Sequence, residues 1–204
     1  MRAELVEGPD ADLLVWRLAP SLVASTATVG GGVGERHWVL NAQVPRDYAR
    51  TDLAEHATEL TSALALRGPG VTMFTAAAVR RVRDAVDGDV AVEATVGVTR
   101  PTWAAAPDEA LDPRPGTINI VVFVPVRFEP GAMLNALVTA TEAKTQALFE
   151  GGVAGTGTAS DALCVVGPLE GPRESFAGPR SPWGARVARA VHAAVAAGLE
   201  PASC

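Results

Sequence analysis

Residues 115–126 read P-G-T-I-N-I-V-V-F-V-P-V, residues 130–148 read P-G-A-M-L-N-A-L-V-T-A-T-E-A-K-T-Q-A-L, and residues 155–166 read G-T-G-T-A-S-D-A-L-C-V-V. The first run is so continuously apolar and β-branched that it predicts a strand at 117–126 with both faces covered. Pro130 suits the first turn of a helix and Gly151-Gly152 its end, so we expect a helix over the second run. The third run predicts a buried strand at 162–166, entered from a turn rich in hydroxyl groups.

Shorter elements are expected on either side of this segment. Apolar residues spaced three and four apart indicate helices, and alternating or continuously apolar runs indicate strands. The small-residue segment 21–28 and the glycine run 30–34 separate the first two strands, because clustered glycines favour a turn. The predicted elements are strands at 13–18, 36–44, 71–75 and 89–99, helices at 52–66, 77–86 and 181–198, and a long loop at 100–116.

Helices and strands are interleaved without a regular βαβ period, and no internal repeat is visible. The sequence therefore predicts a layered mixed α/β domain with helices packed outside the sheet or sheets. A chain of 204 residues is within the size range of one domain, so we expect a single domain over 1–204. The order of the strands is not readable from the sequence.

Composition narrows the classes of partner. The chain is 48% hydrophobic and 20% charged, with a formal net charge of −6 and basic and acidic residues interspersed. No basic stripe is present to neutralise phosphates, so a nucleic-acid partner is disfavoured. The first residues carry acids where a signal peptide has an apolar run, and no apolar stretch approaches the roughly 20 residues that span a bilayer. With only two cysteines, Cys164 and Cys204, we expect a cytoplasmic protein without membrane contact.

The predicted helix at 130–148 carries a polar stripe. Asn135, Thr139, Glu142 and Gln146 recur at four, three and four residues, which places them on one face. A solvated face is the ordinary explanation, but Asn and Thr are poor helix formers with short, directional hydrogen-bonding groups, which favours a binding role. The residues expected on the opposite, core-facing side are Leu134, Leu137, Val138, Thr141 and Leu148.

The turn at 155–161 gathers hydroxyls, two glycines and the carboxylate of Asp161 in front of a buried strand. The same residue types also make ordinary turns. ATP binding is disfavoured, because the turn lacks the lysine of a phosphate-binding loop and follows a helix rather than a strand.

Metal and cofactor signals are weak. His37, His56 and His192 lie far apart in sequence, so we predict no metal site and no cofactor. Cys164 lies within an apolar run and is expected to be a core residue. His37 directly follows the glycine turn, which suits either a ligand-lining residue or a simple strand entry.

At several blocks the chain resembles the adenosylcobinamide amidohydrolase family of corrinoid salvage enzymes. The most specific blocks are T-A-T-E-A-K-T at 139–145 and G-T-G-T at 155–158. The other matching blocks, which occur in the family's order over most of the chain, are 25–34, 36–44, P-R-D-Y at 45–48, M-F-T-A-A at 73–77, 115–122, 130–148, 155–166 and F-A-G at 176–178 with the closing helix. One departure is T-R-P-T-W at 99–103, where family members carry small residues; it concerns substrate specificity rather than reaction class.

The resemblance implies hydrolysis of the amide that joins the aminopropanol arm to the corrin ring of adenosylcobinamide, giving adenosylcobyric acid. Some family members also act on complete corrinoids. The implied partner is thus a corrinoid small molecule that carries its own cobalt, and a homo-oligomer is compatible with the sequence.

Amide hydrolysis needs an activated water molecule or protein nucleophile, a stabilised oxyanion and a protonated leaving amine. Candidates for the base are Glu142 and Asp161, and candidates for a covalent nucleophile are Thr156, Thr158 and Ser160. Oxyanion donors are expected among Asn41, Asn119 and the amides of 155–158. The full set of expected substrate-binding residues is Gly30, Gly31, Gly32, His37, Asn41, Asn119, Asn135, Thr139, Lys144, Gly155, Gly157 and Ser160.

Two other classes of protein are alternatives to a corrinoid amide hydrolase. A corrinoid-binding protein without hydrolytic activity would present the same small-residue surface, and it differs only in lacking a carboxylate and a donor that converge on one point. A self-processing threonine or serine amidohydrolase is disfavoured, because cleavage before Thr156 or Thr158 would create a chain end just after a helix.

Overall fold

The two apolar runs form neighbouring parallel strands at the centre of the fold. The computed structural model describes residues 2–8, 11–107 and 116–199. Strand β7 (Thr117–Phe123) pairs in parallel with β9 (Ala162–Pro168). Helix α2 (Pro130–Glu150) connects them, so the segment quoted first folds as a strand–helix–strand unit. Its predicted strands and helix are confirmed.

The remaining elements extend this pair on both sides. They are β1 (Glu4–Val6), β2 (Leu13–Ser25), β3 (Gly32–Gln43), α1 (Leu53–Ala63), β4 (Gly70–Thr75), a 3₁₀ turn (Val79–Arg81), β5 (Arg83–Asp87), β6 (Val90–Gly97), β8 (Arg127–Phe128), β10 (Arg173–Glu174) and α3 (Pro182–Leu199). The eight-stranded sheet has the order β4-β3-β2-β9-β7-β6-β5, with β1 paired to β2 outside this path. Parallel and antiparallel pairs both occur in it, which confirms the predicted mixed α/β class.

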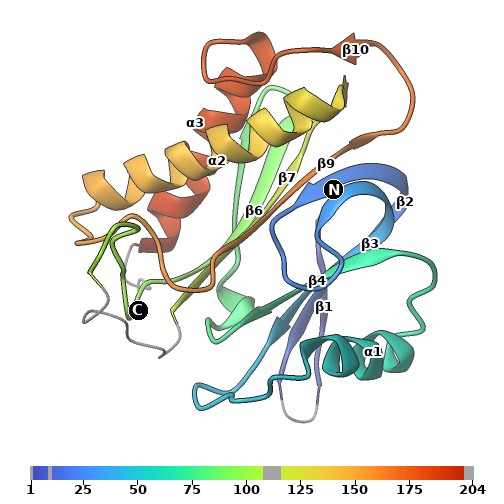
Figure 1. Cartoon of the computed structure of the whole chain (residues 1–204), viewed down its shortest axis with the longest axis vertical. Coiled ribbons are helices and arrows are strands. Elements are labelled where there is room, and N and C mark those ends of the chain that lie inside the picture. The colour runs from blue at the N-terminus through green and yellow to red at the C-terminus, as the bar shows by residue number, and fades with distance from the viewer. Residues whose placement is uncertain (1, 9–10, 108–115, 200–204) are drawn as a thin grey trace.

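Strand β2 changes neighbours along its length, and this folds the sheet over on itself. Its register with β3 shifts between Arg17 and Ser21. Before the shift β2 pairs with β1, and after it with β9. Such an irregularity bends a strand and increases its twist. As a result, the part of the sheet that holds β1, β3 and β4 lies across the part that holds β6, β7 and β9 (Figure 1).

Three apolar clusters mark the resulting layers. One lies between α2, α3 and the near face of β6, β7 and β9. A second lies between the two parts of the sheet and includes Trp16, Met73 and Val121. The third lies under α1, where Leu40 meets the partly buried Leu60. Helices therefore cover both outer faces, with α2 and α3 on one side and α1 on the other (Figure 1).

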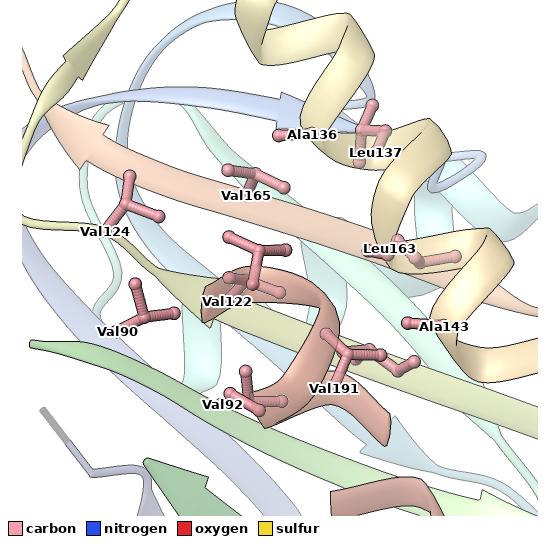
Figure 2. Packing of buried hydrophobic residues seen from close by; sticks show 14 of the residues in the cluster. Val90, Val92, Val122, Val124, Ala136, Leu137, Ala143, Leu163, Val165 and Val191 are labelled. Carbon is pink, nitrogen blue, oxygen red and sulfur yellow. The ribbon is translucent and has the colours of Figure 1, made fainter. Parts of the chain in front are cut away.

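Small and branched side chains build the layer beneath α2 and α3. Figure 2 shows Val92 and Val122 of the sheet beside Ala136 and Ala143 of α2 and Val191 of α3. Alanines allow a helix to lie close to the sheet, and valines fit its pleated surface. This close packing holds one edge of α2 against the turn that precedes β9.

Two of the sequence expectations about elements are wrong. The segment 77–86 is not a helix, because only a 3₁₀ turn forms at Val79–Arg81 and residues Arg83–Asp87 pair with β6 as an edge strand. Residues 21–25 do not separate two strands but continue β2. In both cases pairing with a distant strand determines the structure, which local residue preferences do not report.

The expected core-facing side of α2 is partly wrong. Leu137 and Leu148 are buried, but Leu134 and Val138 are 53% and 52% exposed, and Thr141 is exposed as well. The buried face consists mainly of alanines together with Lys144. Alanine is only weakly apolar, so a buried face made of alanines is hard to recognise in a sequence. The larger Leu134 and Val138 predicted the wrong face. Of the predicted loop at 100–116, residues 108–115 lie outside the described residues, as does Cys204.

Candidate active site

A cavity of about 700 Å³ opens where β4 and β6 end and β7 begins. The chain leaves these three strands at one end of the layer between the two parts of the sheet, so its loops surround the opening. We call it the strand-end cavity. Its lining residues are Arg46, Ala76, Ala77, Ala78, Arg81, Val96, Gly97, Val98, Thr99, Arg100, Gly116 and Thr117.

Asp161 lies behind the wall formed by Gly116 and Thr117. Its Oδ1 atom accepts hydrogen bonds from the backbone N–H of Ile118 at 2.9 Å and from the Thr158 hydroxyl at 2.5 Å. Its Oδ2 atom accepts one from the backbone N–H of Thr158 at 3.1 Å and one from Lys144 Nζ. The side chain of Asp161 is 9% exposed, so four donors surround a nearly buried carboxylate.

The Lys144–Asp161 ion pair joins α2 to the turn before β9. The Lys144 side chain is 6% exposed, and burying such a charge requires a partner. Gly157 makes room for the pair, because a Cβ atom there would stand 2.4 Å from Asp161 Oδ2 and 2.5 Å from Lys144 Nζ. The second glycine of the G-T-G-T block, Gly157, is thus explained by the space that the ion pair needs. Lys144 was expected to bind substrate, and the structure places it instead on Asp161.

A chain of hydroxyl groups runs from this ion pair to the cavity wall. The Thr158 hydroxyl oxygen also lies 2.6 Å from the carbonyl oxygen of Gly116, so its one proton can be donated either to this carbonyl or to Asp161. The same carbonyl accepts a bond from Ser160 Oγ at 3.1 Å. Ser160 Oγ in turn lies 2.8 Å from Thr117 Oγ1. Thr158 is a partly exposed residue, and its hydroxyl has a carboxylate partner.

The Thr156 hydroxyl has a different setting. It accepts a bond from the backbone N–H of Ala104 at 2.9 Å, and its own N–H donates to the carbonyl oxygen of Thr102 at 2.8 Å. Thr156 therefore fixes the loop after β6 against the turn. Gly155 is buried against the same loop, since a Cβ atom there would meet Thr102 at 2.8 Å.

Asn41 and Asn119 lie deep between the two parts of the sheet rather than on the cavity lining. Asn41 Nδ2 donates to Thr95 Oγ1 at 3.0 Å, and Asn119 Nδ2 donates to Asn41 Oδ1 at 2.8 Å and to the carbonyl oxygen of Phe74 at 3.1 Å. Both side chains are 1% exposed. The Nδ2 group of each side chain is hydrogen-bonded within the protein, and Asn119 Oδ1 has no hydrogen-bond partner among the described residues.

The polar stripe of α2 does not converge on Asp161. Glu142 is exposed and stands two residues before Lys144, on the opposite side of the helix. Asn135 is also exposed, beside a separate surface pocket with Gly178 and Ser181. Thr139 is buried and donates to the carbonyl oxygen of Ala177 at 2.8 Å, which anchors the loop before α3. The structure therefore does not bring Glu142 and Asp161 together.

The glycine turn and His37 lie at the start of β4, whereas the cavity lies beyond its end. A Cβ atom at Gly30 would stand 2.0 Å from the carbonyl oxygen of Gly70, the first residue of β4. His37 packs against Gly68 and lies 2.9 Å from Glu35 Oε1. With about 3.3 Å per strand residue, the five steps along β4 separate these groups from the cavity. The companion glycines of the turn, Gly31 and Gly32, share its position.

Sequence reasoning did not assign the arginines and Thr117 to the cavity. Arg46 belongs to the P-R-D-Y block and Arg81 to a segment predicted as a helix, so neither stood out. The free thiol of Cys164 is an unsuitable nucleophile, because complete burial raises its pKa to about 12. Among the described residues, no cluster of three His, Cys, Asp or Glu side chains forms a metal site. In the same part of the chain, each helix is too short or too polar to span a membrane.

Comparison with known proteins gives consistent matches. A model of the adenosylcobinamide amidohydrolase family matches residues 1–203. A protein named adenosylcobinamide amidohydrolase from Halobacterium salinarum is 32% identical over 167 residues, which cover 77% of this chain and 71% of that protein. One with the same name from Methanosarcina mazei is 27% identical over 186 residues, covering 87% and 90%. The crystal structure of the PH0078 protein from Pyrococcus horikoshii OT3 covers 97% of this chain and 80% of its own, but its TM-score of 0.48 and identity of 11% are too low for an inference.

Proposed function

The chain belongs to the adenosylcobinamide amidohydrolase family, and from this membership we propose that it hydrolyses the amide between the aminopropanol arm and the corrin ring of adenosylcobinamide. The products are adenosylcobyric acid and aminopropanol, and the reaction serves corrinoid salvage. The two relatives carry the same activity in their names at 32% and 27% identity. The corrinoid brings its own cobalt, so the chemistry assigned to the protein is that of an amide hydrolase without a cofactor.

The observation that carries the proposal is the hydroxyl–carboxylate–ammonium series beside the strand-end cavity. Thr158 Oγ1 lies 2.5 Å from Asp161 Oδ1, and Lys144 fixes the other carboxylate oxygen. A nucleophile in contact with a base, which a third group orients, is the usual arrangement for nucleophilic catalysis. Thr158 is partly exposed beside Gly116, which lines the cavity, and the arm of a corrinoid can enter there.

In the proposed mechanism Thr158 Oγ1 attacks the amide carbon while its proton passes to Asp161 along their existing hydrogen bond. The C–N bond then breaks, and aminopropanol leaves with that proton. Water hydrolyses the resulting ester, which releases the carboxylate and restores the Thr158 hydroxyl. The ion pair with Lys144 keeps the Asp161 carboxylate in place during these proton transfers. Glu142 has no role in this scheme.

Turnover of adenosylcobinamide by the purified protein, with the product separated by chromatography, tests the activity. Thr158→Ala and Asp161→Asn should lower kcat by about 10²–10⁴-fold while corrinoid binding is retained. Thr158→Ser keeps a hydroxyl and should retain part of the turnover. A base at Glu142 predicts the opposite pattern, with Glu142→Gln inactive and Asp161→Asn active.

A corrinoid-binding protein without hydrolytic activity is the competing function. It predicts tight binding of adenosylcobinamide with no release of aminopropanol, and equal affinity in Thr158→Ala and the unmodified protein. Failure of turnover on both adenosylcobinamide and complete corrinoids would favour this alternative.

A further inference from the structure

Two solvent-exposed arginines line the strand-end cavity of a protein that is acidic overall. They are Arg46 and Arg81, and the lining includes no acidic residue among the described parts of the chain. The formal net charge of the whole protein is −6. Two guanidinium groups at one opening repel each other weakly through the solvent, and an anionic ligand bound between them would replace that repulsion by attraction.

Arg81 contrasts with its neighbour Arg80 on the same 3₁₀ turn. Val79 is fully buried and fixes the turn in the layer between the two parts of the sheet. Arg80 points outward and binds two carboxylates, those of Asp12 and Glu7. The side chain of Arg81 forms no hydrogen bond or ion pair with any described residue, and it lines the cavity. Of two adjacent arginines, one thus forms ion pairs on the protein surface and the other lines the cavity.

Arg46 is also held at the cavity without a carboxylate partner in the described structure. Its loop leaves β3 where the Val44 N–H donates to the carbonyl oxygen of Thr75 at 2.8 Å. Two residues after Arg46, the Tyr48 hydroxyl lies 2.7 Å from His56 Nδ1, and the Tyr48 ring stacks on Phe74. The loop is fixed on both sides of Arg46, so little of its backbone freedom remains to be lost when a ligand binds.

We propose that Arg46 and Arg81 form an oxyanion-binding subsite in the strand-end cavity. Guanidinium groups recognise carboxylate and phosphate oxygens through paired, charge-assisted hydrogen bonds. Two oxyanions suit a corrinoid amide hydrolase, and this part of the inference rests on the proposed function. One is the carboxylate that hydrolysis creates on the corrin ring. The other is a phosphate ester on the hydroxyl of the aminopropanol arm.

The subsite predicts a specific order of affinities. Hydrolysis turns a neutral amide into a carboxylate, so adenosylcobyric acid should bind more tightly than adenosylcobinamide if the carboxylate occupies the subsite. If a phosphate occupies it, the phosphate ester of adenosylcobinamide should bind more tightly than adenosylcobinamide itself. In both cases inorganic phosphate should bind the free protein, and its affinity should fall as the salt concentration rises.

Isothermal titration calorimetry of the full chain measures all four ligands directly, without relying on turnover. Arg46→Gln and Arg81→Gln should each weaken binding of inorganic phosphate by about 10-fold or more, because each removes a charged hydrogen-bond donor. Arg81→Lys keeps the charge and should lose less. Arg80→Gln is the matched control, since it removes one charge from the same turn outside the cavity and should leave phosphate binding unchanged. Circular dichroism checks that each variant folds.

The outcomes separate the subsite from the proposed function. If Arg46→Gln and Arg81→Gln lose phosphate binding, and the unmodified protein does not turn over adenosylcobinamide, the subsite is supported and the hydrolase is rejected. Normal turnover with no phosphate binding, and with unchanged corrinoid affinities in both variants, would overturn the subsite and leave the hydrolase in place. An equal loss in Arg80→Gln would also overturn it, because the effect would then reflect net charge alone.

Discussion

The two faces of the β6–β7–β9 part of the sheet are packed by opposite means. Toward α2 and α3, valines and alanines such as Val122 and Ala136 fill the layer by shape alone (Figure 2). Toward the other part of the sheet, apolar residues share the layer with Glu93, Thr95 and Asn119. The first face can be formed by many apolar sequences of similar volume, whereas the second requires each polar group to find its own partner.

The polar face also leads to the cavity. Along β7, Asn119 lies in the interior and Thr117 lies two residues nearer the end, on the same face. Along β6, Glu93 accepts a hydrogen bond from Trp16 in the interior, while Gly97 lines the cavity. Along these strands the face toward α2 and α3 is packed by apolar side chains, and the opposite face continues into the strand-end cavity. Substitutions on the apolar face should therefore change stability, whereas substitutions at the cavity end of the polar face should also change the kinetics of hydrolysis.

The largest effect is expected where α2 meets the turn before β9. Lys144→Ala leaves the nearly buried Asp161 carboxylate without its cation, and breaking a buried pair in this way costs about 3–5 kcal/mol of unfolding free energy. Urea denaturation measures it. Gln146→Ala on the exposed side of the same helix is the control and should change little. A loss below about 1 kcal/mol would mean that the pair behaves like an exposed one.

The apolar face should respond next. Leu148 is fully buried at the end of α2, and Leu148→Ala should lower the free energy of unfolding by about 2–5 kcal/mol through lost burial and a residual cavity. The kinetics of adenosylcobinamide hydrolysis by the folded fraction should stay unchanged, since Leu148 does not line the cavity. A change in KM without a change in stability would contradict the division between the faces.

The apolar face was the more predictable of the two. The continuous run of β7 and the Pro130 start of α2 fix their elements locally, so both were identified correctly. The exposure of Leu134 was not predicted, because burial of the alanine face of α2 depends on its contacts with α3 and the sheet. The edge strand Arg83–Asp87 likewise depends on its pairing with β6.

The site was predictable as a set of blocks but not as a geometry. Asp161 and Thr158 lie close in sequence, and their turn was identified as a candidate site. The partnership of Asp161 with Lys144 joins residues 17 positions apart and depends on the space at Gly157. Arg46 and Arg81 come together because β3 and β4 are neighbouring parallel strands that end side by side, and this pairing joins segments about 30 residues apart, which local residue preferences do not report.

A smaller effect is expected for the polar face. Asn41→Ala removes the acceptor of Asn119 Nδ2 and the donor to Thr95 Oγ1, both in a buried layer. Leaving such groups unpaired should cost about 1–3 kcal/mol of unfolding free energy. A double-mutant cycle with Thr95→Val isolates the Asn41–Thr95 bond, and additive effects would show that the two side chains are not coupled.

The smallest effect is expected outside both faces, in the aromatic group of Tyr48, His56 and Phe74 under α1. Burial, followed by the charge of Arg50, lowers the pKa of His56 below 6.5, so the unfolded chain takes up its proton at a higher pH than the folded protein. The stability that neutral His56 contributes is therefore complete above pH 6.5 and declines as the pH falls below it.

The expected result is a lower free energy of unfolding at pH 5.5 than at pH 7.5, with a shallower decline in His56→Phe, which keeps a ring for the stack on Phe74. Asp52, whose pKa is lowered to about 2 by Arg50, and Glu59, lowered from 4.5, lose their contributions only at more acidic pH, so they do not produce this slope. Identical slopes in the two proteins would assign the pH dependence to other groups. The bonds between Asn41, Thr95 and Asn119 contain no titratable group, so Asn41→Ala should lower stability equally at both pH values.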